Sequence, residues 1–312
     1  MSNKTSEKIK DGLGCLGCII SIVFLIWFFR TQCDFIWDAI EEHRNRPGKD
    51  SFQAQDAEHV FESTRMAYDF GNARTLTEDA HIILVYVNDD NSQWTEENAN
   101  IFSQDVVLPC LNFIKEQAAS YGYSIDLPVT TYYATIEGTI YDHYQETEDG
   151  SYETADITLD SFSVPPKIAQ ALGYEGNMEM LEAHRKELDA KQIAYIFIPN
   201  CTGWSHACKK DSEQGNYNLE YCMVYPYQPG DTPTAASTVA HETLHQFGAE
   251  DLYEKDGQRV GRAQLASELH PYEIMLHQYP DISENMVGKY TAYTIGWLDE
   301  FPEEYNTDTW WN

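Results

Sequence analysis

The feature that most restricts how this chain can fold is an HExxH stretch that continues as HExxHxxGxxD, with His241, Glu242, His245, Gly248 and Asp251 at the defined positions. On a helix, the two histidines stand four residues apart and therefore lie on the same face. Two imidazoles so placed can hold one Zn²⁺ at about 2.0–2.1 Å. The glutamate is rotated by about 100° around the helix axis, which puts it beside the metal. The glycine lets the chain leave the helix in a left-handed conformation, so that the aspartate can fold back as a third ligand.

The residues before the first histidine predict that this helix is buried. Thr232 or Asp231 is the expected N-cap, and Pro233 takes the first helical position. Small and apolar residues follow at helical spacing, namely Ala236, Val239, Ala240, Leu244 and Phe247. Two histidines and a glutamate inside a buried helix need polar partners, and a metal ion supplies them. The alternative, in which the histidines are ordinary solvated residues, does not account for the glycine and aspartate at these offsets.

The motif resembles the metzincin zinc peptidases, in the variant where aspartate replaces the usual third histidine, as in snapalysin-like and immune-inhibitor-A-like bacterial peptidases. The resemblance covers residues 231–277. It implies that His241, His245 and Asp251 bind Zn²⁺, with the fourth position left for water. It also implies that Glu242 is the general base and later the general acid of a metalloendopeptidase.

The resemblance further implies a methionine in a tight turn beneath the metal site. The sequence Glu-Ile-Met-Leu-His at 273–277 fits this element, with Met275 as the candidate and Met286 as the second choice. The alternative for Met275 is an ordinary core residue between two other apolar side chains.

A run of eighteen residues without charge, 12–29, lies near the N-terminus. As a helix it would be about 27 Å long, close to the thickness of the hydrocarbon core of a bilayer. Three lysines precede it and several acidic residues follow, which favours an N-terminus inside the cell. We therefore expect a short cytoplasmic tail (1–11), a single-pass transmembrane anchor (12–30), a stem with one helix (31–79) and an extracytoplasmic zinc metallopeptidase domain (80–312).

A cleaved signal peptide is the alternative for the apolar run, and it would make the protein secreted. The run ends in Phe28-Phe29-Arg30, without the small residues that signal cleavage needs. An uncleaved anchor is therefore the preferred interpretation.

The order of elements in residues 80–312 predicts an α/β (α+β) domain with a mixed sheet and an active-site helix, and the resemblance implies a metzincin-like fold. Apolar and β-branched runs predict strands at 81–87, 130–136, 193–198 and 217–225. Helices are expected at 95–121 with a kink or break at Pro109, and at 168–172, 178–192, 263–270 and 290–298. The acidic segment 142–160 is predicted to be a surface insertion. Histidines outside the motif, such as His184, are predicted to lie on the surface.

The segment 200–227 adds two expectations. Cys201, Cys208 and Cys222 lie close in sequence, and outside the cytoplasm a disulfide within this trio is expected. Cys110 is expected either to pair with the third cysteine or to stay buried and free. In the resembled family the strand before the zinc helix pairs with an extended substrate, and 217–225 is the corresponding segment. An ordinary sheet strand is the alternative.

The formal net charge of −31 restricts the partners. Such a surface argues against binding to nucleic acid and to anionic lipid. It favours basic or neutral protein and peptide substrates, and the membrane is contacted through the N-terminal helix alone.

Two alternative functions remain open at this point. A gluzincin-like zinc peptidase would use a glutamate further downstream as third ligand, and Glu268 is the candidate. A non-catalytic, membrane-tethered binding module would use the zinc for structure, although it would not need Glu242. Tyr272, Tyr290 and Tyr293 are candidates for stabilising an oxyanion.

Overall fold

The computed structural model describes residues 71–140, 143–146, 152–155, 159, 163–208, 219–254 and 260–311. Contacts divide the chain into two units, Met1–Phe61 and Glu62–Asn312, and every described residue belongs to the second. The predicted cytoplasmic tail, membrane anchor and most of the stem lie outside the described residues. Within the described part of the chain, no helix combines the length and the apolar character that crossing a bilayer requires.

A five-stranded sheet lies at the centre, in the order β2-β1-β5-β7-β6. Its strands are β1 (His81–Asn88), β2 (Val129–Thr135), β5 (Ile193–Pro199), β6 (His206–Cys208) and β7 (Tyr221–Met223). Four strands are parallel, and β6 joins β7 in the antiparallel direction. The interior of β1 and all of β5 are buried, as expected for central parallel strands that are covered on both faces. The predicted α/β class with a mixed sheet is thus confirmed.

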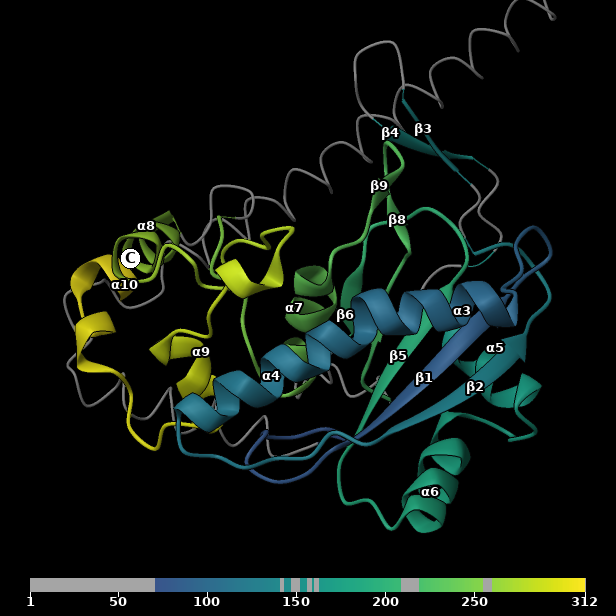
Figure 1. The fold of residues 1–312 in the computed structure, drawn as a ribbon, viewed down its shortest axis with the longest axis horizontal. Coiled ribbons are helices and arrows are strands. Elements are labelled where there is room, and N and C mark those ends of the chain that lie inside the picture. The colour runs from purple at the N-terminus through teal and green to yellow at the C-terminus, as the bar shows by residue number, and fades with distance from the viewer. Residues whose placement is uncertain are drawn as a thin grey trace, which may run out of the picture. The chain divides into compact units, whose positions relative to one another are not determined.

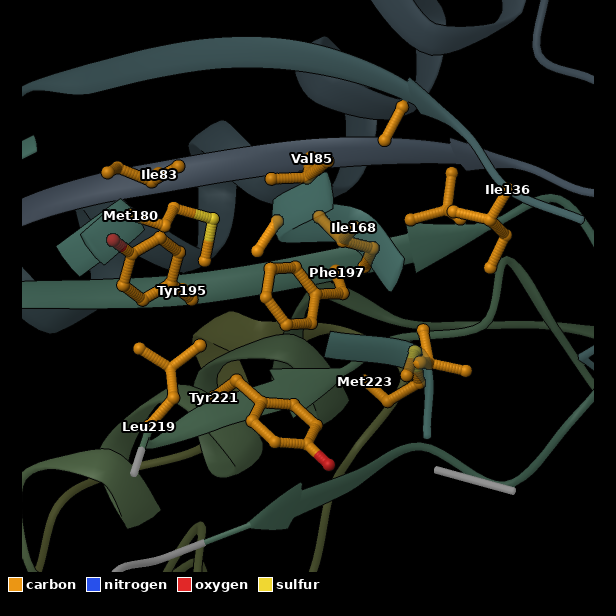
Figure 2. Packing of buried hydrophobic residues seen from close by; sticks show 14 of the residues in the cluster. Ile83, Val85, Ile136, Ile168, Met180, Tyr195, Phe197, Leu219, Tyr221 and Met223 are labelled. Atoms are coloured by element: carbon orange, nitrogen blue, oxygen red, sulfur yellow. The ribbon is translucent and has the colours of Figure 1, made fainter. Parts of the chain in front are cut away.

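Helices cover both faces of this sheet (Figure 1). On one face, alternate residues of β1, β5 and β7 pack with α5 (Val164–Ala171) and α6 (Asn177–Leu188) into one apolar cluster. Figure 2 shows this cluster, which includes Ile83, Val85, Ile168, Met180, Tyr195, Phe197, Tyr221 and Met223. His184 of α6 is fully buried and bonds the Tyr195 hydroxyl at 2.9 Å, so the prediction of a surface histidine was wrong.

The opposite face carries the long helical segment predicted at 95–121. It consists of α3 (Glu96–Phe102), the π-helical turn η2 (Ser103–Val107) and α4 (Leu108–Ser120). Thr95 caps α3 by accepting a hydrogen bond from the backbone N–H of Asn98, at 3.1 Å. The interruption lies directly before Pro109, because proline has no N–H for the α-helical hydrogen bond.

Helix α7 (Ala236–Gln246), which carries the HExxH motif, begins later than the sequence indicated. Thr232–Pro233 forms β9, which pairs with β8 (Tyr227–Gln228) in a small hairpin. The hydroxyl of Thr234 donates to the carbonyl of Tyr225 at 2.5 Å, and this hairpin contact replaces the predicted N-cap at Thr232 or Asp231. The prediction that His241 and His245 lie on one buried helix is confirmed.

Of the predicted strand at 217–225, the structure describes residues 219–225, and among these Tyr221–Met223 forms strand β7. It also lies between β5 and β6, so both of its edges are already paired. The expectation that this strand pairs with a substrate is therefore wrong. The strand at the edge of the sheet on this side is β6, which the sequence analysis did not predict.

The remaining elements surround these layers. Within the acidic segment 142–160, β3 (His143–Glu146) and β4 (Tyr152–Ala155) form an antiparallel pair. The C-terminal part contains α8 (Val260–Leu269), η3 (Ile282–Glu284), α9 (Lys289–Thr294), η4 (Glu303–Tyr305) and α10 (Asp308–Trp311). The predicted helix at 290–298 thus ends before Gly296, whose φ is +92°.

Residues 71–79, which the sequence analysis assigned to the stem, pack onto this domain. The side-chain amide of Asn72 donates to the carbonyls of Ile193 and Glu220 at 2.8 and 2.9 Å. Leu76 is fully buried, and its carbonyl accepts the indole N–H of Trp297 at 2.7 Å. The chain therefore enters the domain before residue 80.

Candidate metal centre

Helix α7 carries the candidate site and is buried on almost its whole circumference, with every residue except Thr238 buried. At its C-terminal end the side chain of Gln246 bonds both the backbone N–H and the carbonyl of Tyr195 in β5, each at 3.1 Å. These two bonds fix α7 against the sheet. Its polar residues are thus held in a rigid, largely dry environment.

The chain reverses after α7 through Gly248, as the sequence predicted. Gly248 has φ of +104°, a conformation that favours glycine. Its N–H donates to the carbonyl of His245 at 3.1 Å, and the N–H of Ala249 donates to that of Leu244 at 3.1 Å. This turn brings Asp251 back beside the helix.

The three predicted ligands meet at one point. Nε2 of His241 lies 3.1 Å from Nε2 of His245. Oδ1 of Asp251 lies 3.2 Å from the first of these nitrogens and 3.0 Å from the second. Among the described residues, these three side chains form the group of histidine, cysteine and carboxylate residues that could hold a metal ion.

The dimensions of this group suit a small divalent ion. A tetrahedral ion at 2.0–2.1 Å from each ligand separates the ligand atoms by about 3.3 Å, and the three observed separations are 3.0–3.2 Å. The histidine side chains are buried, whereas the side chain of Asp251 is 24% exposed. Two imidazoles and one carboxylate are therefore a group that could hold a divalent metal ion, since His nitrogen and Asp oxygen are both metal ligands in proteins.

Backbone carbonyls orient both rings for metal binding. Nδ1 of His241 lies 3.0 Å from the carbonyl of Ile274, and Nδ1 of His245 lies 2.8 Å from that of Ala249. A proton on Nδ1 of each ring can bond these carbonyls and leaves Nε2 as the free donor, which is the tautomer that a metal requires. Both carbonyls contact a ligand ring, and no periodicity in the sequence indicates them.

The charges in the group reinforce one another. Burial alone would raise the pKa of Asp251, but its contacts with the two histidines lower it far below the usual range. Burial would lower the pKa of His241, yet the hydrogen bond to Asp251 and the charges of Glu242 and Asp251 raise it. Without a metal, the carboxylate thus favours a proton in the site, and a cation is the natural replacement for that proton.

Glu242 is the remaining polar residue of the motif. It is buried, with 7% of its surface exposed. Burial is the largest cause of the raised pKa of the Cys208 thiol on β6, and the negative charge of Glu242 raises it further. The same charge contributes to the raised pKa of His241. The glutamate therefore lies close to the metal-binding group without belonging to it, as the helical offset predicted.

The turn at 273–277 lies next to the ligands. Met275 is fully buried, and its carbonyl accepts the N–H of Leu252 at 2.9 Å, directly after Asp251. The preceding carbonyl, of Ile274, is the one that holds His241. Met286, the second candidate, lies behind this turn, where its carbonyl accepts the N–H of Ile274 at 2.9 Å.

Two further residues border the site without a signal in the sequence. Nε2 of Gln278 lies 2.8 Å from Nδ1 of His241 and donates to the carbonyl of Ile274 at 3.3 Å. The ring of Tyr253 lies parallel to the ring of His241, with centroids 6.2 Å apart and an interplanar angle of 22°. Both residues contact a ligand ring and restrict its motion.

Other predicted residues lie elsewhere. Glu268 is exposed and accepts a hydrogen bond from Gln264 at 3.0 Å, so the structure does not bring it to the histidines. Tyr272 is 52% exposed, and the hydroxyl of Tyr290 donates to Glu250 at 2.9 Å. Tyr293 packs edge-on against Phe301.

The expected disulfide is not present among the described residues. Cys110, Cys201, Cys208 and Cys222 are all free thiols. Burial raises the pKa of Cys110 to about 12 and that of Cys222 well above its usual range, which keeps these thiols protonated and unreactive.

Comparisons with known proteins add no family assignment. No family model matches the chain, and no curated protein matches it in sequence.

Proposed function

We propose that this domain is a zinc-dependent endopeptidase that hydrolyses peptide bonds in protein or peptide substrates. The observation that carries the proposal is the meeting of two histidine nitrogens and one carboxylate oxygen within 3.2 Å, with a buried glutamate beside them. A purely structural metal site does not need that glutamate. A catalytic site does, because hydrolysis requires a base to accept the proton of water.

His241, His245 and Asp251 hold the zinc ion. The bound ion supplies Lewis acidity, which lowers the pKa of water toward about 7 and polarises a carbonyl group. Glu242 accepts the proton from the attacking water while the new C–O bond forms. The same carboxyl then donates this proton to the leaving amine as the C–N bond breaks. Because Glu242 is buried, the proton stays within the site between the two steps.

The edge strand β6 supports recognition of an extended peptide. It is the last strand in the sheet order, and it contacts α7. A peptide can add to such an edge through main-chain hydrogen bonds, with side-chain pockets giving specificity. The strongly negative chain favours basic or neutral segments as substrates.

The variant Glu242→Gln tests whether Glu242 is the general base. We expect hydrolysis of casein to fall by about 10²–10⁴-fold, the usual contribution of a general base. Zinc content should stay at one ion per chain, because the residue is not a ligand. Glu268→Gln is the matched control, since its side chain is exposed and outside the group.

Three results would contradict this proposal or favour one of its alternatives. Full activity of Glu242→Gln would remove the general-base role. Loss of zinc in Glu268→Ala but not in Asp251→Ala would favour the gluzincin-like alternative. A wild-type protein that binds zinc but hydrolyses no member of a peptide library would favour the alternative of a non-catalytic, membrane-tethered binding module.

The proposal includes a membrane anchor at residues 12–30 with the domain outside the cytoplasm. A protease added to intact cells should digest the domain, whereas a cytoplasmic domain would be digested only after permeabilisation. A mature chain that begins after residue 30 would instead show a cleaved signal peptide.

A further inference from the structure

Glu273 is a carboxylate with no exposed surface at the first position of the turn 273–277. Its Oε1 accepts the hydroxyl of Thr291 at 3.1 Å and the N–H of Met275 at 3.3 Å. Its Oε2 accepts the N–H of Gly288. Burying a carboxylate is costly unless hydrogen bonds compensate, and here three donors from two separate segments offset part of that cost.

The backbone that Glu273 holds is the backbone that holds the metal ligands. Ile274 supplies the carbonyl that orients His241, at 3.0 Å. Met275, whose N–H the carboxylate accepts, supplies the carbonyl that accepts the N–H of Leu252, at 2.9 Å. Leu252 directly follows Asp251. One buried carboxylate therefore fixes a turn that contacts both ligand-bearing segments, helix α7 at His241 and the chain directly after Asp251.

Helix α9 closes the other side of the carboxylate. Thr291 lies on this helix and is fully buried. A Cβ added at Gly288, the residue before α9, would lie only 2.2 Å from Oε2 of Glu273. The carboxylate thus fills its space closely and joins the turn to α9.

We propose that Glu273 is a positioning residue of the metal centre, which joins the turn 273–277 to α9 and thereby orients His241 and the segment after Asp251. It touches neither the metal nor the substrate in this role. The inference rests on the proposed metal centre and extends it to a residue outside the motif.

The test compares zinc and cobalt binding by full-length Glu273→Gln and Glu220→Gln. Glu220 is also buried and accepts backbone N–H groups, from Asn72 and Ala73 at 2.9 and 3.3 Å, at a place outside the metal-binding group. We expect Glu273→Gln to bind Zn²⁺ about 10–100-fold more weakly than wild type, the usual loss when a residue that orients a metal ligand is changed. Its Co²⁺ complex should show an altered d–d absorption spectrum. Glu220→Gln should lose thermal stability but keep wild-type affinity and spectrum.

Thr291→Val provides a milder change if Glu273→Gln does not fold. It removes one donor to Oε1. Thr294→Val on the same helix is its control, because the hydroxyl of Thr294 donates to the carbonyl of Thr291 at 2.9 Å, along the helix and not to Glu273. We expect Thr291→Val to bind Zn²⁺ more weakly than wild type and Thr294→Val to bind it with wild-type affinity. Wild-type affinity and cobalt spectrum in both Glu273→Gln and Thr291→Val would overturn the inference.

These outcomes separate the inference from the proposed function. A wild-type chain that binds zinc without hydrolysing peptides refutes the peptidase and still permits the comparison of affinities. An active wild-type enzyme whose Glu273→Gln variant binds zinc normally refutes only the positioning role.

Discussion

His241 and His245 each bond a backbone carbonyl with Nδ1 and turn Nε2 toward Asp251. At the scale of single residues, the ligand geometry thus depends on carbonyls at 274 and 249 as well as on the ligands. The first of these carbonyls belongs to the turn that Glu273 holds. We therefore expect metal affinity to depend on residues that do not contact the ion.

The buried carboxyl of Glu273 predicts a pH dependence of stability. Burial raises its pKa from 4.5 to about 7, against the opposing effects of its hydrogen bonds and of the charge on His241. Burial raises the pKa of the Tyr121 and Tyr305 hydroxyls, and the negative charge of Glu273 raises both further. Between pH 4.5 and 7 the folded state binds more protons than the unfolded state, so stability falls as pH rises through this window.

We expect Glu273 to lower the free energy of unfolding by roughly 3 kcal/mol across that window, at about 1.4 kcal/mol for each pKa unit. In Glu273→Gln this part of the slope should disappear, because glutamine does not titrate. Urea unfolding at a series of pH values measures it, with Glu220→Gln as control. Equal slopes in Glu273→Gln and wild type would contradict the raised pKa.

At the scale of elements, the site is the end of α7 together with two turns. The turn at Gly248 carries Ala249 back to His245, and the turn at 273–277 receives Leu252. Neither turn is part of a regular element, yet both are fixed by backbone hydrogen bonds. The helix supplies two ligands, and the turns determine whether the third can reach them.

Gly248→Ala tests the contribution of the first turn. A residue with a Cβ at φ of +104° is strained by about 1–2 kcal/mol, so we expect lower thermal stability. Zinc affinity should fall as well, because the strain moves Ala249 and Asp251. Gly122→Ala is the matched control: this glycine also follows a helix, has φ of +89°, and has open space where the new Cβ would lie.

The two glycine variants are compared by thermal unfolding and by zinc competition with a chromophoric chelator. Both should lose a similar amount of stability, and only Gly248→Ala should lose affinity. A Gly248→Ala variant with wild-type zinc affinity would show that the turn does not control the third ligand.

At the scale of the whole molecule, the net charge of −31 acts on every approaching substrate. A field of this sign attracts basic peptides and repels acidic ones, and it changes association rates by about 10–10³-fold at low salt. Salt screens this effect, since the Debye length falls from about 10 Å at 0.1 M to about 3 Å at 1 M.

We therefore expect a peptide flanked by lysines to be cleaved with a kcat/KM at least about tenfold above that of the same core flanked by glutamates, at low salt. The ratio should approach one near 1 M salt. Measuring both peptides over a salt series checks this, and an uncharged flank serves as the reference. A ratio that does not change with salt would assign the preference to local contacts instead of the overall charge.

Much of the fold follows from local patterns in the sequence. The apolar runs that became β1 and β5 are buried on both faces, and such strands leave a clear signal. Strand β6 has only three residues, each partly buried, and so leaves none. The start of α7 was misplaced because Thr234 bonds Tyr225 in a hairpin, which competes with helix capping at Thr232.

The sequence by itself determined the ligand-bearing helix, because the four-residue spacing of His241 and His245 and the glycine after them act over a single turn of chain. Only the tertiary structure decided that Asp251 and not Glu268 joins them, that β6 forms the edge of the sheet, and that Glu273 lies beneath the site. These contacts join residues far apart in the chain, such as 241 and 274. Packing brings such residues together, and no local spacing records it.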